Sequence, residues 1–229
     1  MPTVVLVNPN TNERTTEMMT ELVRPLLARA GLAVEGITVA HGPRMLINPT
    51  TLAAAAPYVI ETVHHRLLAP IEADPGREVV AVIVAAIGDP GRDQLESELE
   101  LPVVGIGQAS ILAAARSGCP FGMATSTPLL ADSLTALVRR HGHSDTFTGV
   151  RLTESEPTVL AADPERQFDE LAAAVRACVT DGAESVIIAG GPLSATARRL
   201  AALNLAPIIE PLPAAAGLTL DQLKLPDPT

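Results

Sequence analysis

Short runs of consecutive apolar residues alternate along this chain with longer segments that have a helical pattern. The apolar runs are typical of strands buried on both faces, and hence of a parallel sheet covered by helices. We expect strands at residues 3–7, 34–39, 79–85, 103–106, 121–124, 149–152, 185–189 and 207–209. We expect helices at residues 13–30, 50–67, 93–98, 108–117, 128–141, 165–180, 193–203 and 212–217.

The repeated alternation of strand and helix predicts an α/β fold with right-handed crossovers. The two halves of the chain also resemble each other, because each has a polar turn after its first strand and a glycine-rich turn after its third. We therefore expect two pseudo-symmetric lobes with parallel sheets. The first lobe would comprise residues 1–112 together with 212–229, and the second residues 113–211.

Two helix starts carry capping signals. Thr127-Pro128 places a hydroxyl at the N-cap and a proline in the first turn, and Asp163-Pro164 does the same with a carboxylate. Both side chains are expected to accept hydrogen bonds from the first turn of the helix that follows.

Composition excludes several classes of protein. Of the 229 residues, 47% are hydrophobic and 18% charged, which is too apolar for a disordered chain. The 16 basic and 26 acidic residues give a net charge of −10, and only 2% of residues are aromatic. Neither the charge nor the aromatic content suits nucleic-acid binding, so the expected partner is a small molecule.

The longest apolar run, residues 79–87, is about half of a membrane span. The first residues lack a basic segment followed by a long apolar one, which a secretory signal would have. We expect a cytoplasmic protein with no membrane association, whose two cysteines stay reduced. The apolar content would also suit a homo-oligomer.

Ligands of open parallel sheets bind beyond the carboxyl ends of the strands. Several of the turns at those ends open helices, whose unpaired N–H groups suit a small anion. The residues that this rule selects are Asn8, Asn10, Thr11, His41, Ala86, Ile87, Gly88, Asp89, Thr125, Ser126, Gly190, Gly191 and Glu210.

His41 and Glu210 each follow a strand and could act as a general base or acid if desolvated. A solvated loop position is the alternative for His41. Asn10, Thr11, Thr125 and Ser126 could bind carboxylate or enolate oxygens, or could only cap helices. For Asp89, organisation of its own turn is the favoured role. No metal site is expected.

Three motifs together resemble the aspartate/glutamate/hydantoin racemase superfamily, with the hydantoin racemase branch the most similar. They are Asn8-Pro9-Asn10-Thr11 after the first strand, Gly88-Asp89-Pro90-Gly91 after the third, and the segment 102–107. Gly42-Pro43, Thr125-Ser126 and the strand at 186–189 extend the similarity over residues 4 to about 216. The resemblance implies two flavodoxin-like lobes with the site in the cleft between them, and no cofactor.

The resemblance also implies two catalytic cysteines, one from each lobe, that act on opposite faces of a substrate carbon. At the matching positions this chain has Ala86 and Gly190, which carry no acidic or basic group. Its own cysteines, Cys119 and Cys178, are expected near the amino ends of strands, away from the site. Loss of the two thiols would enlarge the pocket.

Three interpretations of the function follow. The first is a superfamily enzyme with diverged, thiol-free chemistry of isomerase, lyase or cyclase type, which acts through an enolate-like state. Its substrate would be a small carboxylate, an amino-acid derivative or a hydantoin-like ring. The second is a catalytically silent protein that binds small anions. The third is a hydantoin racemase from which the cysteines have been removed by engineering.

Overall fold

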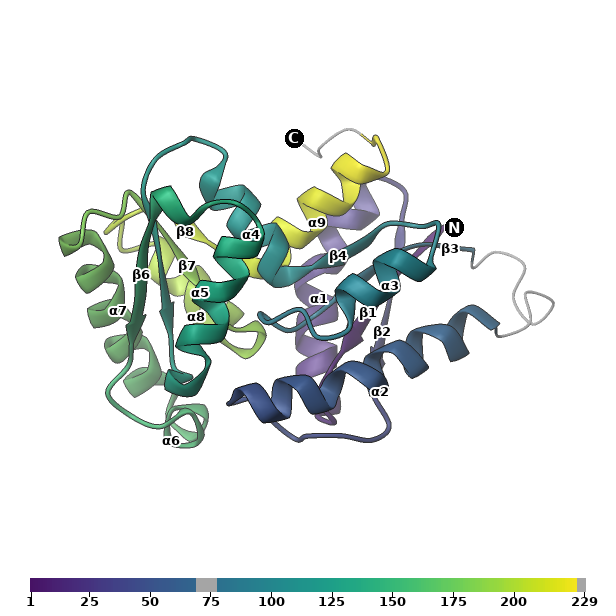
Figure 1. Ribbon diagram of the computed structural model, residues 1–229, viewed down its shortest axis with the longest axis horizontal. Coiled ribbons are helices and arrows are strands. Elements are labelled where there is room, and N and C mark those ends of the chain that lie inside the picture. Colours follow the sequence, from purple (N-terminus) through teal and green to yellow (C-terminus); the bar gives the residue numbers. More distant parts are fainter. Residues whose placement is uncertain (69–77, 226–229) are drawn as a thin grey trace. The chain divides into compact units, whose positions relative to one another are not determined.

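The computed structural model of the chain describes residues 1–68 and 78–225. The chain divides into two compact units. Unit 1 comprises Met1–Leu46, Thr50–Ile106 and Leu212–Thr229, and unit 2 comprises Ile47–Pro49 and Gly107–Pro211. Each unit is built on its own four-stranded parallel sheet with helices on both faces (Figure 1). The predicted α/β class with parallel sheets is confirmed.

The sheet of unit 1 has the strand order β2-β1-β3-β4. Its central strand β1 is buried at all six positions, as its unbroken apolar run predicts. One face packs against α2 and α3 through a cluster that includes Val5, Val7, Val59 and Leu95, and α1 packs on β1 and β2. The elements are β1 (Thr3–Asn8), α1 (Glu13–Arg29), β2 (Ala33–Thr38), α2 (Pro49–Leu68), β3 (Val79–Val84), α3 (Arg92–Glu98), β4 (Val103–Gly105) and α9 (Pro211–Gln222).

The sheet of unit 2 has the equivalent order β6-β5-β7-β8. Helices α7 and α8 cover one face through Leu171, Val175, Ala197 and Leu200, and α5 lies on the other side of the sheet (Figure 1). The elements are α4 (Ile106–Ala115), β5 (Phe121–Thr125), η2 (Pro128–Leu130), α5 (Ala131–Arg140), η3 (Ser144–Thr146), β6 (Phe147–Leu152), α6 (Pro157–Ala162), α7 (Pro164–Thr180), β7 (Ser185–Ile188), η4 (Gly191–Leu193), α8 (Ser194–Ala201) and β8 (Ile208–Ile209).

The structure corrects the sequence predictions at three helices. Helix α6 was not predicted, because it is only six residues long, begins at Pro157 and ends just before the next proline, Pro164. Helix α9 does not end at Gly217 but continues to Gln222, since Thr219 and Leu220 beyond the glycine are buried and Thr219 Oγ1 donates to Ala215 O. The predicted helix at 128–141 begins instead with the short 3-10 turn η2.

One of the two predicted caps is confirmed and the other is wrong. The Asp163 carboxylate accepts from the Arg166 backbone N–H at 3.1 Å, as expected of an N-cap. The Thr127 side chain makes no capping hydrogen bond. Its hydroxyl lies instead 2.9 Å from that of Thr125, within the turn that the two residues share.

No helix among residues 1–68 and 78–225 is both long enough and apolar enough to cross a membrane.

Candidate functional site

In unit 1, the turn after β1 is held by a network of asparagine side chains. The buried Asn8 donates from Nδ2 to Asn10 Oδ1 and Thr16 Oγ1, and its Oδ1 accepts from the Asn10 backbone N–H. Asn10 Oδ1 also accepts from Asn12 N at 2.9 Å. Because this oxygen already has two donors, the part of the Asn10 side chain left for a ligand is its Nδ2 group.

The neighbouring Thr11 connects this turn to the loop after β2. Its backbone N–H donates to Pro43 O at 3.2 Å, and its half-buried side chain makes no hydrogen bond with a described residue. The hydroxyl of Thr11 is therefore available to a ligand, whereas its N–H is not.

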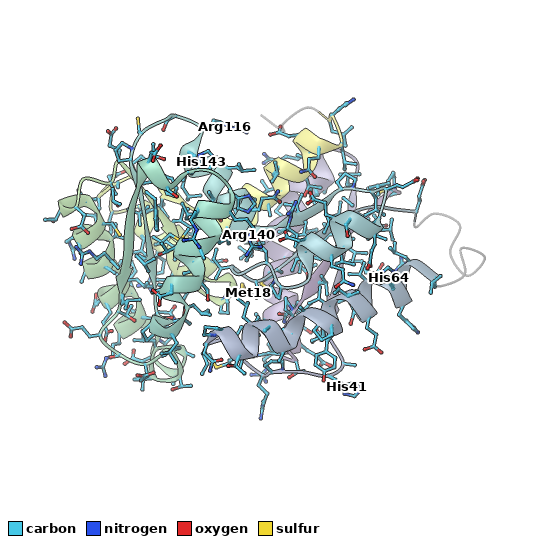
Figure 2. All side chains as sticks on the ribbon, in the orientation of Figure 1. Met18, His41, His64, Arg116, Arg140 and His143 are labelled. Carbon is cyan, nitrogen blue, oxygen red and sulfur yellow. The ribbon has the colours of Figure 1, made fainter. Side chains whose placement is uncertain are left out.

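His41 lies in the loop that follows β2 and is exposed to solvent. Its ring packs edge-on against Tyr58 of α2, with the ring centroids 6.4 Å apart. Figure 2 shows His41 at the margin of unit 1, beyond α2. The hypothesis that His41 is a general base required its side chain to be buried. In the structure the side chain is exposed.

The turn after β3 is tightly packed. Asp89 N donates to Ala86 O at 2.9 Å, and Asp89 has a left-handed backbone with φ of 50°. Its carboxyl group packs on the Cα of Gly105, where a Cβ would overlap it. Asp89 is 7% exposed, so we assign its carboxylate a structural role in packing this turn. At the predicted ligand positions Ile87 is buried, while Ala86 and Gly88 are half-buried.

In unit 2, the residues that end β5 are bonded to the end of β7. Thr125 Oγ1 donates to Ala189 O at 2.8 Å and accepts from the backbone N–H of Thr127. Thr125 is fully buried, and its hydroxyl proton is committed to Ala189. Ser126 is 5% exposed and its hydroxyl makes no hydrogen bond with a described residue, so Ser126 is the better ligand group of this pair.

Gly190 and Gly191 form the turn that follows β7. Gly190 has extended backbone angles, φ 169° and ψ 127°, which other residues also adopt. A Cβ at position 190 would lie 3.0 Å from both Cδ1 and Cγ of Leu193. The space beside Gly190 is therefore partly filled by Leu193, so the expected gain in pocket volume is reduced here. Gly191 O accepts from Ser194 Oγ at 2.7 Å, which ties the turn to α8.

Glu210 follows β8 directly. In the parallel register Ile187 pairs with Ile209, so Glu210 lies level with Ile188 and close to the Gly190 turn. The side chain is 22% exposed, but its Oε2 is buried and accepts no hydrogen bond from the described residues. Its nearest charged partner is Arg198 of α8, whose Nε is 3.7 Å from this oxygen.

The two cysteines lie away from these turns. Cys178 of α7 is 1% exposed, packs against Gly122 in the middle of β5 and donates from Sγ to Met123 O. Burial raises the pKa of its thiol to about 11. Cys119 precedes β5, at the amino end of that strand. Neither thiol lies in the strand-end turns described above.

A groove of about 570 Å³ opens elsewhere in unit 2, between β6 and α7. It is lined by Arg151, Leu152, Asp169 and Glu170 among others and contains none of the predicted site residues. Within residues 1–68 and 78–225, no three His, Cys, Asp or Glu side chains are grouped to hold a metal ion.

Sequence reasoning missed two residues of the unit 2 turns. Leu193 borders Gly190, and Arg198 borders Glu210. A signal was present for Arg198, because the first two turns of a helix that follows a strand remain near the carboxyl edge of the sheet. No pattern in the sequence indicates that Leu193 turns back onto Gly190.

Comparison with known proteins gives one family. The family model for Asp/Glu/hydantoin racemase matches residues 4–219. The hydantoin racemase of Paenarthrobacter aurescens is 26% identical over 213 residues, which are 93% of this chain and 87% of that protein.

Solved structures share the fold. The allantoin racemase of Pseudomonas fluorescens superposes with a TM-score of 0.84 at 23% identity, over 98% of this chain and 93% of that one. A variant of arylmalonate decarboxylase superposes with a TM-score of 0.63 at 15% identity, over 97% and 94% of the two chains. Because the family model covers almost the whole sequence and the motifs lie at its strand ends, the chain belongs to the Asp/Glu/hydantoin racemase family of enzymes.

Proposed function

We propose that this chain is a cofactor-independent enzyme that moves a proton at a carbon next to a carbonyl group, with Glu210 as the base. The reaction passes through an enolate-like state and uses no thiol at positions 86 or 190. Isomerase, lyase and cyclase outcomes all share this first step. The substrate is a small carboxylate, an amino-acid derivative or a hydantoin-like ring, in keeping with the relatives that act on hydantoin and allantoin.

The observation that carries the proposal is the state of the Glu210 carboxylate. Its Oε2 is buried and accepts no hydrogen bond from the described residues, at the carboxyl edge of the unit 2 sheet. A buried carboxylate oxygen without a hydrogen-bond donor is unusual in folded proteins and points to a role beyond packing. A general base needs a lone pair that is not already engaged in a hydrogen bond, and this oxygen has one.

The thiol positions support the same proposal. The methyl group of Ala86 and the hydrogen of Gly190 cannot take up a proton. The buried Cys178, with its raised pKa, is not a substitute. A single base on one side of the carbon favours removal and return of the proton on one face, which exchanges hydrogen without racemisation.

The developing negative charge needs donors. Within unit 2, the candidate is the Ser126 hydroxyl, which makes no hydrogen bond with a described residue. Such preorganised donors stabilise an enolate oxygen in the transition state. The Gly190–Gly191 turn of the same unit would supply backbone contacts.

Solvent deuterium exchange tests the proposal. The protein is incubated in heavy water with substituted hydantoins, amino acids and substituted malonates, and loss of the α-proton signal is followed by NMR together with optical purity. We expect exchange with retained configuration, and a fall of at least about 100-fold in Glu210→Gln. Exchange that survives in Glu210→Gln but is lost in His41→Ala would make His41 the base instead. Exchange with full racemisation would contradict one-face chemistry.

The absence of any proton-carrying group at positions 86 and 190 also favours a second function, a catalytically silent protein that binds small anions. No exchange with any compound, combined with saturable binding of one of them, would favour this function over the enzyme.

We further propose that the protein works in the cytoplasm. We also propose that it forms a homo-oligomer, which its apolar composition supports. Sedimentation equilibrium of the purified chain tests the second point, since a mass near 24 kDa would contradict it.

A further inference from the structure

Among the described arginines of unit 2, only Arg198 forms an ion pair with Glu210, and the two groups are far apart for such a pair. Its Nε is 3.7 Å from Glu210 Oε2, beyond hydrogen-bond distance, and its side chain is 60% exposed. The guanidinium thus makes no hydrogen bond with a described residue, while its charge lies beside the proposed base.

The neighbouring arginines are engaged more closely. Arg199 donates to Glu165 at 2.9 Å and also lies over the ring of Phe168, 4.3 Å from its centroid. Arg166 donates to Glu170 at 2.9 Å. Arg198 thus lacks the close hydrogen bonds that Arg166 and Arg199 make.

Among the described residues of unit 2, no other charged side chain forms an ion pair with Glu210. The strand paired with β8 is β7, which carries no titratable side chain. Helix α8 packs on β8 and presents Arg198 and Arg199, the second of which is paired with Glu165 of α7. Helix α9, which follows Glu210, has one titratable side chain, Asp221, ten residues after the helix begins.

We propose that Arg198 binds a carboxylate group of the substrate and so selects carboxylate-bearing substrates over neutral rings. This inference rests on the proposed function, because it takes the Glu210 edge as the site. A planar guanidinium can contact two carboxylates at once, so Arg198 would lie between the substrate anion and Glu210 and compensate both negative charges. Without it, two carboxylates in a partly buried site would repel each other.

A matched pair of probes tests this selectivity. N-carbamoylalanine and 5-methylhydantoin share one carbon skeleton, but only the first carries a carboxylate at pH 7. Equilibrium binding of each is measured by ligand-observed NMR, which needs no turnover. We expect the wild-type protein to bind N-carbamoylalanine, and Arg198→Gln to weaken that binding by about 10- to 100-fold. Binding of 5-methylhydantoin should change by less than about 3-fold.

Two further variants separate the carboxylate contact from general effects of charge. Arg198→Lys keeps the charge but loses the planar fork, so it should restore only part of the affinity. Arg199→Gln removes the same charge from the next position of the same helix, and it should leave the binding of both probes unchanged.

The inference is overturned if the wild-type protein does not prefer N-carbamoylalanine, or if Arg199→Gln weakens its binding as much as Arg198→Gln does. Binding that depends on Arg198 in a protein without exchange activity would support this inference while the proposed function fails. Exchange that is lost in Glu210→Gln, in a protein whose binding of N-carbamoylalanine is unchanged by Arg198→Gln, would support the proposed function and overturn this inference.

Discussion

The carboxyl group of Asp89 packs on the Cα of Gly105, so that a side chain at position 105 would overlap it. Asp89 itself has a left-handed backbone, and Gly105 is the last residue of β4. The contact joins the turn after β3 to the end of the neighbouring strand. It explains why the motif Gly88-Asp89-Pro90-Gly91 occurs together with a glycine at the end of the next strand, and it assigns Asp89 to the structure of the site rather than to its chemistry.

Substitution of Gly105 tests this contact. Gly105→Ala should lower the free energy of unfolding by about 2 kcal/mol, because the new methyl group displaces a buried carboxyl group that has little room to move. Urea denaturation measures the change. Gly217→Ala is the control, since a Cβ there meets no atom within 4 Å and the position is helical. That variant should be stabilised by up to about 1 kcal/mol, and equal midpoints for the two variants would refute the contact.

The reactivity of the two cysteines should differ sharply. Cys178 is 1% exposed and its pKa is raised to about 11, so it holds very little thiolate at pH 8. We expect iodoacetamide to modify Cys119 in the native protein and to reach Cys178 only in denaturant. Mass spectrometry of the peptides reads both sites. Native alkylation of Cys178 at a rate comparable to that of Cys119 would contradict the buried position.

Cysteine alkylation also bears on the mechanism. If the proposed chemistry is thiol-free, alkylation of Cys119 should leave the rate of α-proton exchange within about 2-fold of the untreated protein. A complete loss of exchange that parallels the modification would show that Cys119 takes part in the reaction.

The pH dependence of stability should contain a contribution from Glu170. The Ser155 hydroxyl and backbone N–H donate to this carboxylate, and with Arg166 they lower its pKa to about 2 from an ordinary value of 4.5. A carboxyl whose pKa is lower in the folded state stabilises the fold above the unfolded value. This contribution is present above pH 4.5 and is lost as the pH falls toward 2.

Thermal unfolding between pH 7 and pH 2.5 measures this contribution. Glu170→Gln should be less stable than wild type at pH 7, and the difference should shrink as the pH falls below 4.5. Glu17→Gln, at an exposed position of α1, is the matched control and should track the wild type throughout. A constant gap between Glu170→Gln and wild type over this range would contradict the linkage.

Strand positions were predictable from this sequence because the central strands are buried on both faces and leave unbroken apolar runs. The carboxyl-edge rule then placed Asn10, Thr125, Gly190 and Glu210 at strand ends, where the structure has them. What each side chain does there was not predictable. The Thr125 hydroxyl is committed to Ala189 O, 64 residues away, and such pairing depends on sheet register rather than on local pattern.

His41 illustrates the same limit. Its place after a strand suggested a base, but burial of a loop residue depends on what packs over it. The structure has Tyr58 beside the ring and leaves His41 exposed, whereas Glu210, with a similar position in sequence, has a buried oxygen. Helix α6 and the reach of α9 beyond Gly217 were likewise decided by tertiary packing, which outweighs weak local propensities.

Restoration of the two thiols tests how far the site has diverged from the two-cysteine pattern that its sequence resembles. Gly190→Cys is compatible with the extended backbone, but its Cβ would lie 3.0 Å from Leu193, so this variant should lose about 1 kcal/mol of stability. Leu193→Val in the same chain should recover part of that loss. The family resemblance implies that thiols at positions 86 and 190 act on one substrate carbon. With Ala86→Cys added, we therefore expect racemisation of 5-methylhydantoin to accompany exchange only in chains that carry both cysteines. Racemisation by the wild-type chain would mean that a second base exists. A folded double-thiol variant that exchanges without racemising would mean that more than the thiols has changed, and would strengthen the case that Glu210 and Arg198 serve a different substrate.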